Sequence, residues 1–240
     1  MMPRLLQIAH DHLSPPNAVA EQFIERGYQI DELLVVPEER FDAPGVDVAF
    51  PDPTGYDAVM LLGAPWSAYA PEVACWVEPE IEMLQSADRA GVPVLGICFG
   101  GQMLATAHGG RVHAAAAPEI GWHLVHGDEF GLSGAWFQWH YDRWVTPPGA
   151  VEVAQTPAAC QAFVLRRNLA LQFHPEVDAA SIKGWLAFGG HEKALAAGLD
   201  PDVILAQSEA LEADSAARAR RLVDTFLDRV AVAPHREVQR

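Results

Sequence analysis

The segment from Val92 to Gln102, V-P-V-L-G-I-C-F-G-G-Q, limits most strongly what this chain can fold into. Its first half is a short apolar run bounded by Gly91 and Pro93, which is typical of a strand buried on both faces of a parallel sheet. A Gly-x-Cys-x-Gly sequence and then a helical pattern follow. A sharp turn between strand and helix exposes one side chain above the sheet edge, and flanking glycines let neighbouring backbone approach closely. The exposed side chain is predicted to be the Cys98 thiol.

Cys98 would therefore lie at a helix N-terminus, where the helix dipole and the free N–H groups stabilise a thiolate. Most lone cysteines are instead small buried hydrophobic residues. A cysteine that only fills a core has no need of glycines on both sides. The pattern thus favours a nucleophile.

Strands and helices alternate around this turn. Apolar runs predict strands over Leu5–Ala9, Leu33–Val36 and Tyr56–Leu62. Apolar residues at a period near 3.6 predict helices after Ser14-Pro15-Pro16 and over Glu72–Arg89. Such alternation predicts an α/β fold with a mostly parallel central sheet and helices on both faces. Short strands separated by turn residues between residues 109 and 172 predict a small antiparallel region. Four helices are expected beyond Pro175, over 181–188, 192–197, 201–206 and 212–230.

Composition excludes several classes of function. The net charge is −16, from 16 basic and 32 acidic residues, so nucleic acid and anionic membranes would repel the chain. No apolar run approaches a membrane span, and the N-terminus is too short and polar for a signal peptide. The three cysteines are too far apart for a disulfide framework, which favours a reducing cytoplasm. Neither lysine follows a glycine, so no phosphate-binding Gly-Lys-Ser/Thr loop exists.

A cysteine nucleophile needs a base and a group that orients the base. His174 follows the apolar run Leu171-Gln172-Phe173 and so would also lie at the end of a strand. Glu176, two residues later, can accept a hydrogen bond from the imidazole and fix its tautomer. The triplet His-Pro-Glu alone is a weak signal, but together with the Cys98 turn it predicts a Cys-His-Glu triad.

An oxyanion hole needs backbone donors near the nucleophile. The segment Gly63-Ala64-Pro65 consists of small residues at another strand end, where a loop can present a backbone N–H. The predicted donors are the N–H groups of Ala64 and of Phe99, the residue after the nucleophile.

In combination and in this order, these segments resemble the class I (triad-type) glutamine amidotransferases over about residues 5–180. The matching segments are G-I-C-F-G-G-Q at 96–102 (the nucleophile elbow), the helix and Gly-Gly turn at 105–112, Q-F-H-P-E at 172–176 (the His-x-Glu motif), G-A-P-W-S at 63–67 (the oxyanion loop), E-I-G-W at 119–122 and H-Y-D at 140–142.

The resemblance implies a flavodoxin-like fold and a set of roles. Cys98 would attack the side-chain amide of glutamine, with His174 as acid and base and Glu176 orienting it. Gly63 and Gln102 match positions that bind the substrate. No cofactor and no metal are implied. Residues 1–180 would form the amidotransferase domain, and residues 181–240 a C-terminal helical extension packed on it.

The chain departs from the family pattern in two ways. Ala64 replaces the second glycine of the oxyanion loop, which is acceptable if its φ is negative. The segment after Glu176 is too short for an ammonia-accepting domain of ordinary size. The chain therefore resembles stand-alone relatives of the GMP synthetase glutaminase domain, a group that includes γ-glutamyl peptidases.

Several functions stay open at this point. Glutamine hydrolysis would supply ammonia to a separate protein partner, whereas a γ-glutamyl peptidase would cleave a small γ-glutamyl compound. The third alternative is an inactive binding subunit, although the intact Cys98, His174 and Glu176 argue against it. An α/β-hydrolase would carry its acid before the histidine, which is not the order here. Homo-oligomerisation is compatible with the sequence and is not decided by it.

Other histidines lie near acidic residues, as in His10-Asp11-His12 and His140-Tyr141-Asp142. Neither group has the spacing of a metal site. No metal ligand is therefore predicted.

Overall fold

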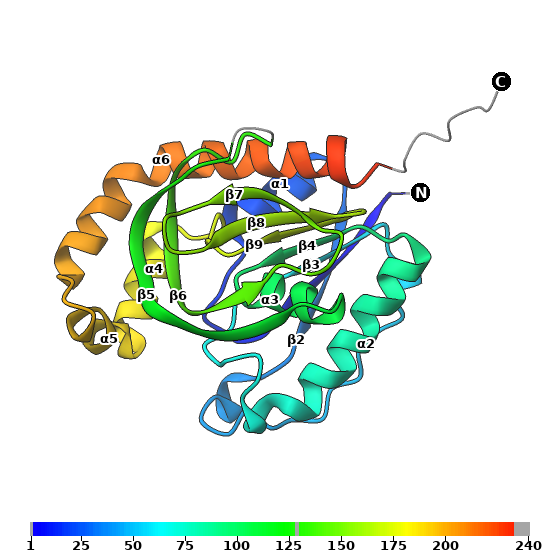
Figure 1. Cartoon of the computed structure of the whole chain (residues 1–240), viewed down its shortest axis with the longest axis horizontal. Helices are drawn as coiled ribbons and strands as arrows, with labels where there is room; N and C mark the ends of the chain where they lie inside the picture. Colours follow the sequence, from blue (N-terminus) through cyan, green and yellow to red (C-terminus); the bar gives the residue numbers. More distant parts are fainter. Residues whose placement is uncertain (1, 128–129, 233–240) are drawn as a thin grey trace.

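A seven-stranded sheet runs through the molecule in the order β2-β1-β3-β4-β9-β8-β7 (Figure 1). The computed structural model describes residues 2–127 and 130–232. Neighbouring strands from β2 to β9 are parallel, whereas β8 pairs antiparallel with both β9 and β7. The strands are β1 (Arg4–Ala9), β2 (Gln29–Leu34), β3 (Ala58–Leu61), β4 (Val94–Ile97), β7 (Val151–Gln155), β8 (Cys160–Leu165) and β9 (Asn168–Leu171).

Helices cover both faces of this sheet. α1 and α6 pack against one face, and α2 and α3 against the other. Side chains of β3 alternate between the two faces, and both faces are apolar. Met60 packs in the core with α1 and α6, and Val59 and Leu61 pack in the core with α2 and α3. The helices are α1 (Asn17–Glu25), α2 (Ala74–Ala90), α3 (Phe99–Ala107), α4 (Ala179–Trp185), α5 (His191–Ala196) and α6 (Pro201–Thr225).

A separate antiparallel hairpin, β5 (Arg111–Val125) and β6 (Gly134–Val145), forms a two-stranded sheet in front of the main one (Figure 1). Its strands are longer than the short pieces expected from the sequence. Short single turns complete the fold: η1 (Glu38–Arg40), η2 (Pro53–Gly55), η3 (Pro71–Val73), η4 (Leu186–Gly190) and η5 (Phe226–Val230). The predicted α/β class with a mostly parallel sheet and a small antiparallel region is confirmed.

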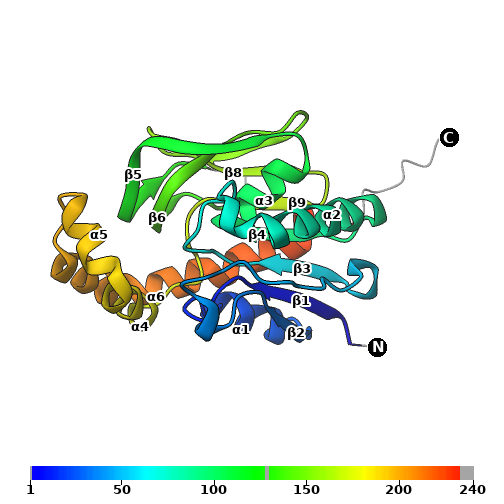
Figure 2. The same ribbon diagram turned by 90° about the horizontal axis from the view of Figure 1, so that it is seen from below.

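The C-terminal region differs in one detail from the sequence prediction. α4 and α5 lie at one end of the molecule, beside the start of α6 (Figure 2). The two helices expected over 201–206 and 212–230 are one continuous helix, α6, because the intervening Q-S-E-A-L contains no glycine or proline. Leu222 and Val223 of α6, with Phe226 of the following turn η5, share a core with Phe23 of α1 and Leu5 of β1.

No helix within residues 2–127 and 130–232 is long and apolar enough to cross a membrane.

Helix α3 lies unusually close to the strands it follows. A Cβ atom on Gly100 would be 2.5 Å from Leu61 Cβ of β3, and one on Gly101 would be 2.7 Å from the Leu171 carbonyl oxygen of β9. A Cβ on Gly96 would be 2.5 Å from the carbonyl oxygen of Gly100. Real side chains do not approach so closely, so only glycine permits this packing.

Replacing Gly100 with alanine should force α3 away from β3. We expect Gly100→Ala to lower the free energy of unfolding by about 1–3 kcal/mol, the usual range for overpacking. Gly184→Ala is the matched control, because a Cβ at this helical glycine meets nothing within 4 Å. It should raise stability by about 0.5–1 kcal/mol. Urea unfolding of the unmodified chain, Gly100→Ala and Gly184→Ala measures the two changes in stability. Equal stability of Gly100→Ala and the unmodified chain would contradict the packing argument.

Candidate active site

Cys98 lies at the turn between β4 and α3 in a strained backbone conformation. Its φ is 51° and its ψ is −104°, and a positive φ in a residue other than glycine is uncommon. The turn is held by two hydrogen bonds: Cys98 N–H donates to the Leu171 carbonyl (2.7 Å), and Gly100 N–H donates to the Leu62 carbonyl (3.2 Å). Strain that is maintained by surrounding hydrogen bonds is characteristic of functional positions.

His174 and Glu176 form a buried pair just beyond the end of β9. The His174 Nδ1 atom is 2.7 Å from Glu176 Oε1, and the two residues are 4% and 1% exposed. His174 N–H donates to the carbonyl of Phe137 in β6 (2.9 Å), and the ring of Trp185 packs edge-on against the imidazole at 5.0 Å. His174 Nε2 is buried and unpaired within the described residues. That nitrogen is therefore available for proton exchange.

Cys98 and His174 converge above Gly63. A Cβ atom built on Gly63 would lie 3.9 Å from Cys98 Cβ and 3.1 Å from His174 Cε1. Any side chain at Gly63 would press on the imidazole, so glycine keeps this space open. The structure thus brings together three residues that are far apart in the sequence.

The charges around His174 raise the pKa of its imidazole well above the ordinary value of 6.5. Burial by itself lowers this pKa, but the negative charges of Glu176 and Cys98 outweigh burial and favour the imidazolium. The imidazole thus interacts with both Glu176 and Cys98, as a base that serves a cysteine nucleophile must.

The backbone N–H groups of Ala64 and Phe99 are both available to a ligand. Neither donates to a protein acceptor within the described residues. Phe99 is the first residue of α3, where N–H groups have no partner inside the helix. Ala64 is not among the residues with positive φ, so its methyl group causes no backbone strain in place of the family's glycine.

Gln102 is 3% exposed and lies next to Gln172. Its Nε2 is 3.5 Å from Gln172 Oε1 and 3.5 Å from the Asp142 carbonyl oxygen. The Gln172 side-chain N–H group in turn donates to Cys98 Sγ at 3.7 Å. Sequence reasoning assigned no role to Gln172. Its position two residues before His174 in an extended segment, on the same side of the strand, is the signal that could have identified it.

A second group missed from the sequence surrounds Asp142. Ser67 Oγ donates to its Oδ2 (2.5 Å), and the Tyr69 hydroxyl donates to its Oδ1 (2.8 Å). Asp142 is 7% exposed, so its carboxylate is fixed in place by two neutral donors. These three residues join the loop after β3 to strand β6 across the site.

One cavity of about 900 Å³ connects these groups. It lies near the upper end of the roughly 300–1,000 Å³ found for small-molecule sites. Glu176 lies behind His174, to which it is hydrogen-bonded. The other six predicted site residues line the cavity: Gly63, Ala64, Cys98, Phe99, Gln102 and His174.

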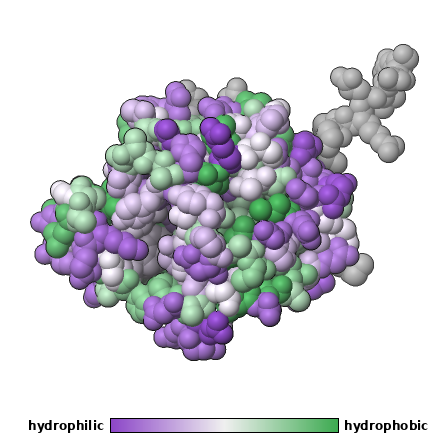
Figure 3. Space-filling model, turned by 60° about the horizontal axis from the view of Figure 1, so that its bottom comes forward, coloured by the Kyte–Doolittle hydropathy of each residue, from purple (hydrophilic) through white to green (hydrophobic). Residues whose placement is uncertain are grey.

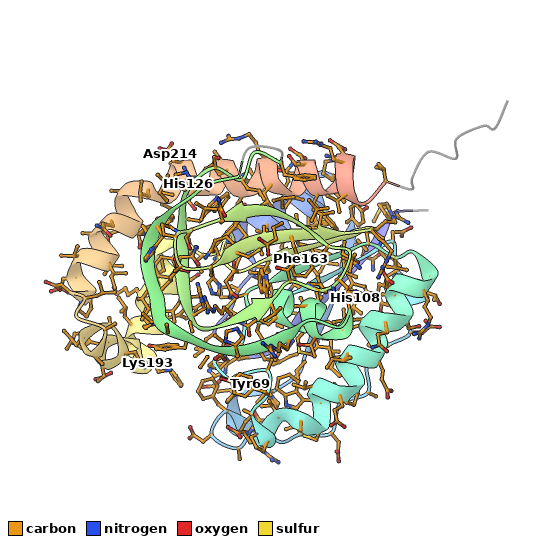
Figure 4. The ribbon with its side chains drawn as sticks, viewed as in Figure 1. Tyr69, His108, His126, Phe163, Lys193 and Asp214 are labelled. Atoms are coloured by element: carbon orange, nitrogen blue, oxygen red, sulfur yellow. The ribbon has the colours of Figure 1, made fainter. Side chains whose placement is uncertain are left out.

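The outer part of the cavity is formed by the 40–45 loop and by residues between Trp185 and Lys193. Figure 3 shows this side of the molecule hollowed, with polar and apolar residues around the hollow. Lys193 and Tyr69, both labelled in Figure 4, lie on this side. The lining contains basic Arg40 and Lys193 and several acidic groups, which suits a zwitterionic ligand.

Within residues 2–127 and 130–232, no group of three or more His, Cys, Asp or Glu side chains could hold a metal ion. His10 is paired with Glu80, and the His140 ring nitrogen Nδ1 lies 2.9 Å from the Asp142 carbonyl oxygen.

The family follows from comparison with known proteins. The class I glutamine amidotransferase family model matches residues 17–188, which includes the Cys98 turn and the His174–Glu176 pair. The chain therefore belongs to the class I glutamine amidotransferase family. It is 40% identical over 131 residues to a glutamine-hydrolysing GMP synthase of Thermomicrobium roseum, and 35% identical over 154 residues to that of Aeropyrum pernix.

These alignments cover 50% and 60% of this chain but only 23% and 28% of the two synthases. The chain thus spans about a quarter of the length of the curated relatives it matches.

Solved structures match over nearly the whole chain. A glutamine amidotransferase from Thermotoga maritima has a TM-score of 0.81 at 27% identity, covering 95% of this chain and 99% of that one. A glutamine amidotransferase from Methylobacillus flagellatus has a TM-score of 0.79 at 22% identity, covering 100% and 99%, and supports the fold alone. The predicted flavodoxin-like amidotransferase fold is confirmed.

The charges around His174 predict its titration. We expect the imidazole to titrate above pH 6.5, and Glu176→Gln to lower its pKa because the largest raising cause is removed. The pKa of His174 is higher in the folded protein than in the unfolded chain, so its protonation stabilises the fold. This stabilisation is complete below about pH 6.5 and is lost as the pH rises through the folded pKa. NMR titration of the histidine rings measures the pKa values. An unchanged His174 pKa in Glu176→Gln would contradict the electrostatic argument.

Proposed function

We propose that the protein hydrolyses the side-chain amide of glutamine by nucleophilic catalysis. The observation that carries the proposal is the convergence of a strained elbow thiol, Cys98, with the buried His174–Glu176 pair above Gly63. A nucleophile, a base and a group that orients the base are the parts that amide transfer to a thiol requires.

In the first half of the proposed reaction, the Cys98 thiolate attacks the γ-amide carbon of glutamine. The resulting oxyanion accepts hydrogen bonds from the N–H groups of Ala64 and Phe99. These donors stabilise the negative charge that develops on the oxygen during the attack. His174 then donates its proton to the departing nitrogen. Ammonia leaves, and a γ-glutamyl thioester remains on Cys98.

In the second half, water attacks the thioester while neutral His174 accepts its proton. The same two N–H groups hold the second oxyanion. When the carbon–sulfur bond breaks, glutamate leaves and the thiolate beside an imidazolium is restored. Glu176 keeps the imidazole in one tautomer throughout.

Substrate recognition is assigned to the open space at Gly63 and to the Gln102 side chain. Gln102 lines the cavity and is fixed by contacts with Gln172 and with the Asp142 backbone. The fixed carboxylate of Asp142 supplies a negative group for the substrate ammonium. No cofactor enters the proposed reaction.

The ammonia would pass to an acceptor outside the described residues. The relatives from Thermomicrobium roseum and Aeropyrum pernix are glutamine-hydrolysing GMP synthases, and this chain matches about a quarter of each. A separate protein partner is the acceptor we propose. We also propose a cytoplasmic location, because the nucleophile needs a free thiol and a reducing cytoplasm keeps thiols reduced.

We also propose that residues 1–180 form the amidotransferase domain and residues 181–240 an extension packed on it. Support comes from the core that α6 shares with α1 and β1. Residues 233–240 of the extension lie outside the described part of the chain.

A second candidate function is hydrolysis of a larger γ-glutamyl compound by the same residues. The observation that favours it is the cavity of about 900 Å³, because glutamine, with only about ten non-hydrogen atoms, leaves much of such a site unfilled. The aromatic side chains of Phe41, Trp66 and Phe188 line its outer part and suit an apolar group beyond the γ-amide nitrogen.

One assay separates these functions. Purified protein is given glutamine and a panel of γ-glutamyl dipeptides, and release of ammonia or of the amino acid is measured. Turnover of glutamine supports the amidotransferase proposal, and cleavage of dipeptides alone supports the second candidate. No turnover of either, with or without a purified synthase, would leave the inactive binding subunit as the better description.

Removal of the thiol should abolish whichever activity is found. We expect Cys98→Ala to reduce kcat by at least about 1,000-fold, as for other nucleophile deletions. Cys75→Ala is the matched control, because Cys75 is an exposed free thiol that does not line the cavity. It should retain full activity. Equal losses in the two variants, or none in Cys98→Ala, would contradict the assigned nucleophile.

A further inference from the structure

A second buried histidine–carboxylate pair lies beneath the loop that carries Ala64. His10 follows β1, and Glu80 lies in α2; both are 0% exposed. The His10 Nε2 atom is 3.0 Å and 3.2 Å from the two Glu80 carboxylate oxygens. Its Nδ1 atom is 3.1 Å from the carbonyl oxygen of Gly63. The reaction proposed above uses neither side chain.

The imidazole of His10 is fixed by aromatic rings as well as by hydrogen bonds. Trp76 stacks on it at 5.7 Å with an interplanar angle of 29°, and Phe99 meets it edge-on at 4.7 Å. His10 therefore contacts both residues around the assigned oxyanion hole: it bonds the peptide between Gly63 and Ala64, and it packs against the Phe99 ring.

The protonation of His10 follows from its partners. A carbonyl oxygen can only accept, so Nδ1 must carry a proton to bond Gly63. The Nε2 atom lies within hydrogen-bond distance of both Glu80 carboxylate oxygens. Burial lowers the pKa of His10, but the charge and hydrogen bond of Glu80 and the Gly63 carbonyl outweigh it, so the pKa is raised above 6.5. The donor to Gly63 is thus the Nδ1–H group of His10.

The geometry of one peptide unit links this hydrogen bond to the active site. The Gly63 carbonyl and the Ala64 N–H belong to the same peptide, and in a trans peptide they point in opposite directions. Among the described residues, no peptide bond is cis. With the carbonyl held on the His10 side, the N–H is directed to the opposite side.

Without a partner for the carbonyl, this peptide loses a restraint against rotation. Gly63 has no side chain to oppose a change in its backbone angles. A rotated peptide would present the carbonyl oxygen, which repels an oxyanion, in place of the N–H donor. A buried charge pair contributes little to stability, because desolvation offsets its attraction. A role in positioning the Gly63 carbonyl therefore accounts better for the pair.

Resting on the function proposed above, we infer that His10, held by Glu80, is a positioning residue that fixes the Gly63–Ala64 peptide so that the Ala64 N–H faces the developing oxyanion. His10 touches neither substrate nor reacting atoms. Its contribution should appear only in steps that form an oxyanion.

Two double variants test this inference. His10→Phe with Glu80→Leu replaces the buried pair with apolar side chains and removes the donor to Gly63. His10→Asn with Glu80→Leu restores an N–H donor near the position of Nδ1. Glutamine turnover and Cys98 alkylation by iodoacetamide are measured for both, because alkylation needs the thiolate but forms no oxyanion.

We expect the Phe variant to lose about 100- to 1,000-fold in kcat, the usual loss for one oxyanion donor, with KM and the alkylation rate changed less than threefold. The Asn variant should recover at least tenfold in kcat. Unchanged kcat in the Phe variant, or a parallel loss of alkylation and kcat, would overturn the inference. If that variant does not fold, His10→Met with Glu80→Gln, which also removes the donor to Gly63 and leaves no buried charge, should lower kcat at least tenfold with alkylation unchanged; an unchanged kcat would overturn the inference.

A direct observation separates failure of this inference from failure of the proposed function. In protein labelled with ¹³C at glycine carbonyls, the Gly63 resonance should shift upfield in the Phe variant and return in the Asn variant. If neither glutamine nor a γ-glutamyl dipeptide is turned over, the proposed function fails. An unshifted Gly63 carbonyl would overturn the inference, whatever the activity.

Discussion

The position of the Cys98 thiol depends on how closely helix α3 approaches the carboxyl ends of β3, β4 and β9. Gly100 and Gly101 allow contact distances that no other residue could adopt. The chain must therefore turn within one residue, and Cys98 takes the strained φ of 51° that results. Because the strand-end hydrogen bonds hold the turn on both sides, packing and hydrogen bonding together maintain a conformation that the local backbone disfavours.

Electrostatics around the site are organised on two sides of Gly63. On one side lies the His174–Glu176 pair, with His174 Cε1 3.1 Å from where a Cβ of Gly63 would be. On the other lies the His10–Glu80 pair, bonded to the Gly63 carbonyl at 3.1 Å. Both imidazoles are buried, and both have a raised pKa because a carboxylate outweighs burial. In the proposed account, the first pair moves protons, and the second maintains the orientation of a backbone donor.

Local sequence patterns were sufficient to predict much of this arrangement. The Cys98 turn and the strand-end position of His174 each follow from fewer than fifteen consecutive residues, where turn chemistry and periodicity decide the structure. The α/β alternation follows from the succession of such segments along the chain. Ala64 and Phe99 line the same cavity as Cys98; their role as oxyanion donors stays a prediction.

Contacts between distant segments were not predictable in this way. His10 and Glu80 are 70 residues apart, and Ser67 and Asp142 are 75 apart. In the sequence His10 showed only an acidic neighbour, Asp11, without the spacing of a metal site, and a polar residue beside a strand has many possible partners. The continuity of α6 was missed for a different reason, since 207–211 carries no clear apolar period although each residue tolerates a helix.

The central claim is that glutamine is converted through a thioester on Cys98, and acid quenching within the first turnover tests it most directly. Peptides from protein quenched in the presence of glutamine would be analysed by mass spectrometry. The account predicts a γ-glutamyl group on the peptide that contains Cys98, absent from unreacted protein and from protein quenched after glutamine is exhausted. Continued turnover of glutamine with no adduct on Cys98, or with the adduct on another residue, would contradict it.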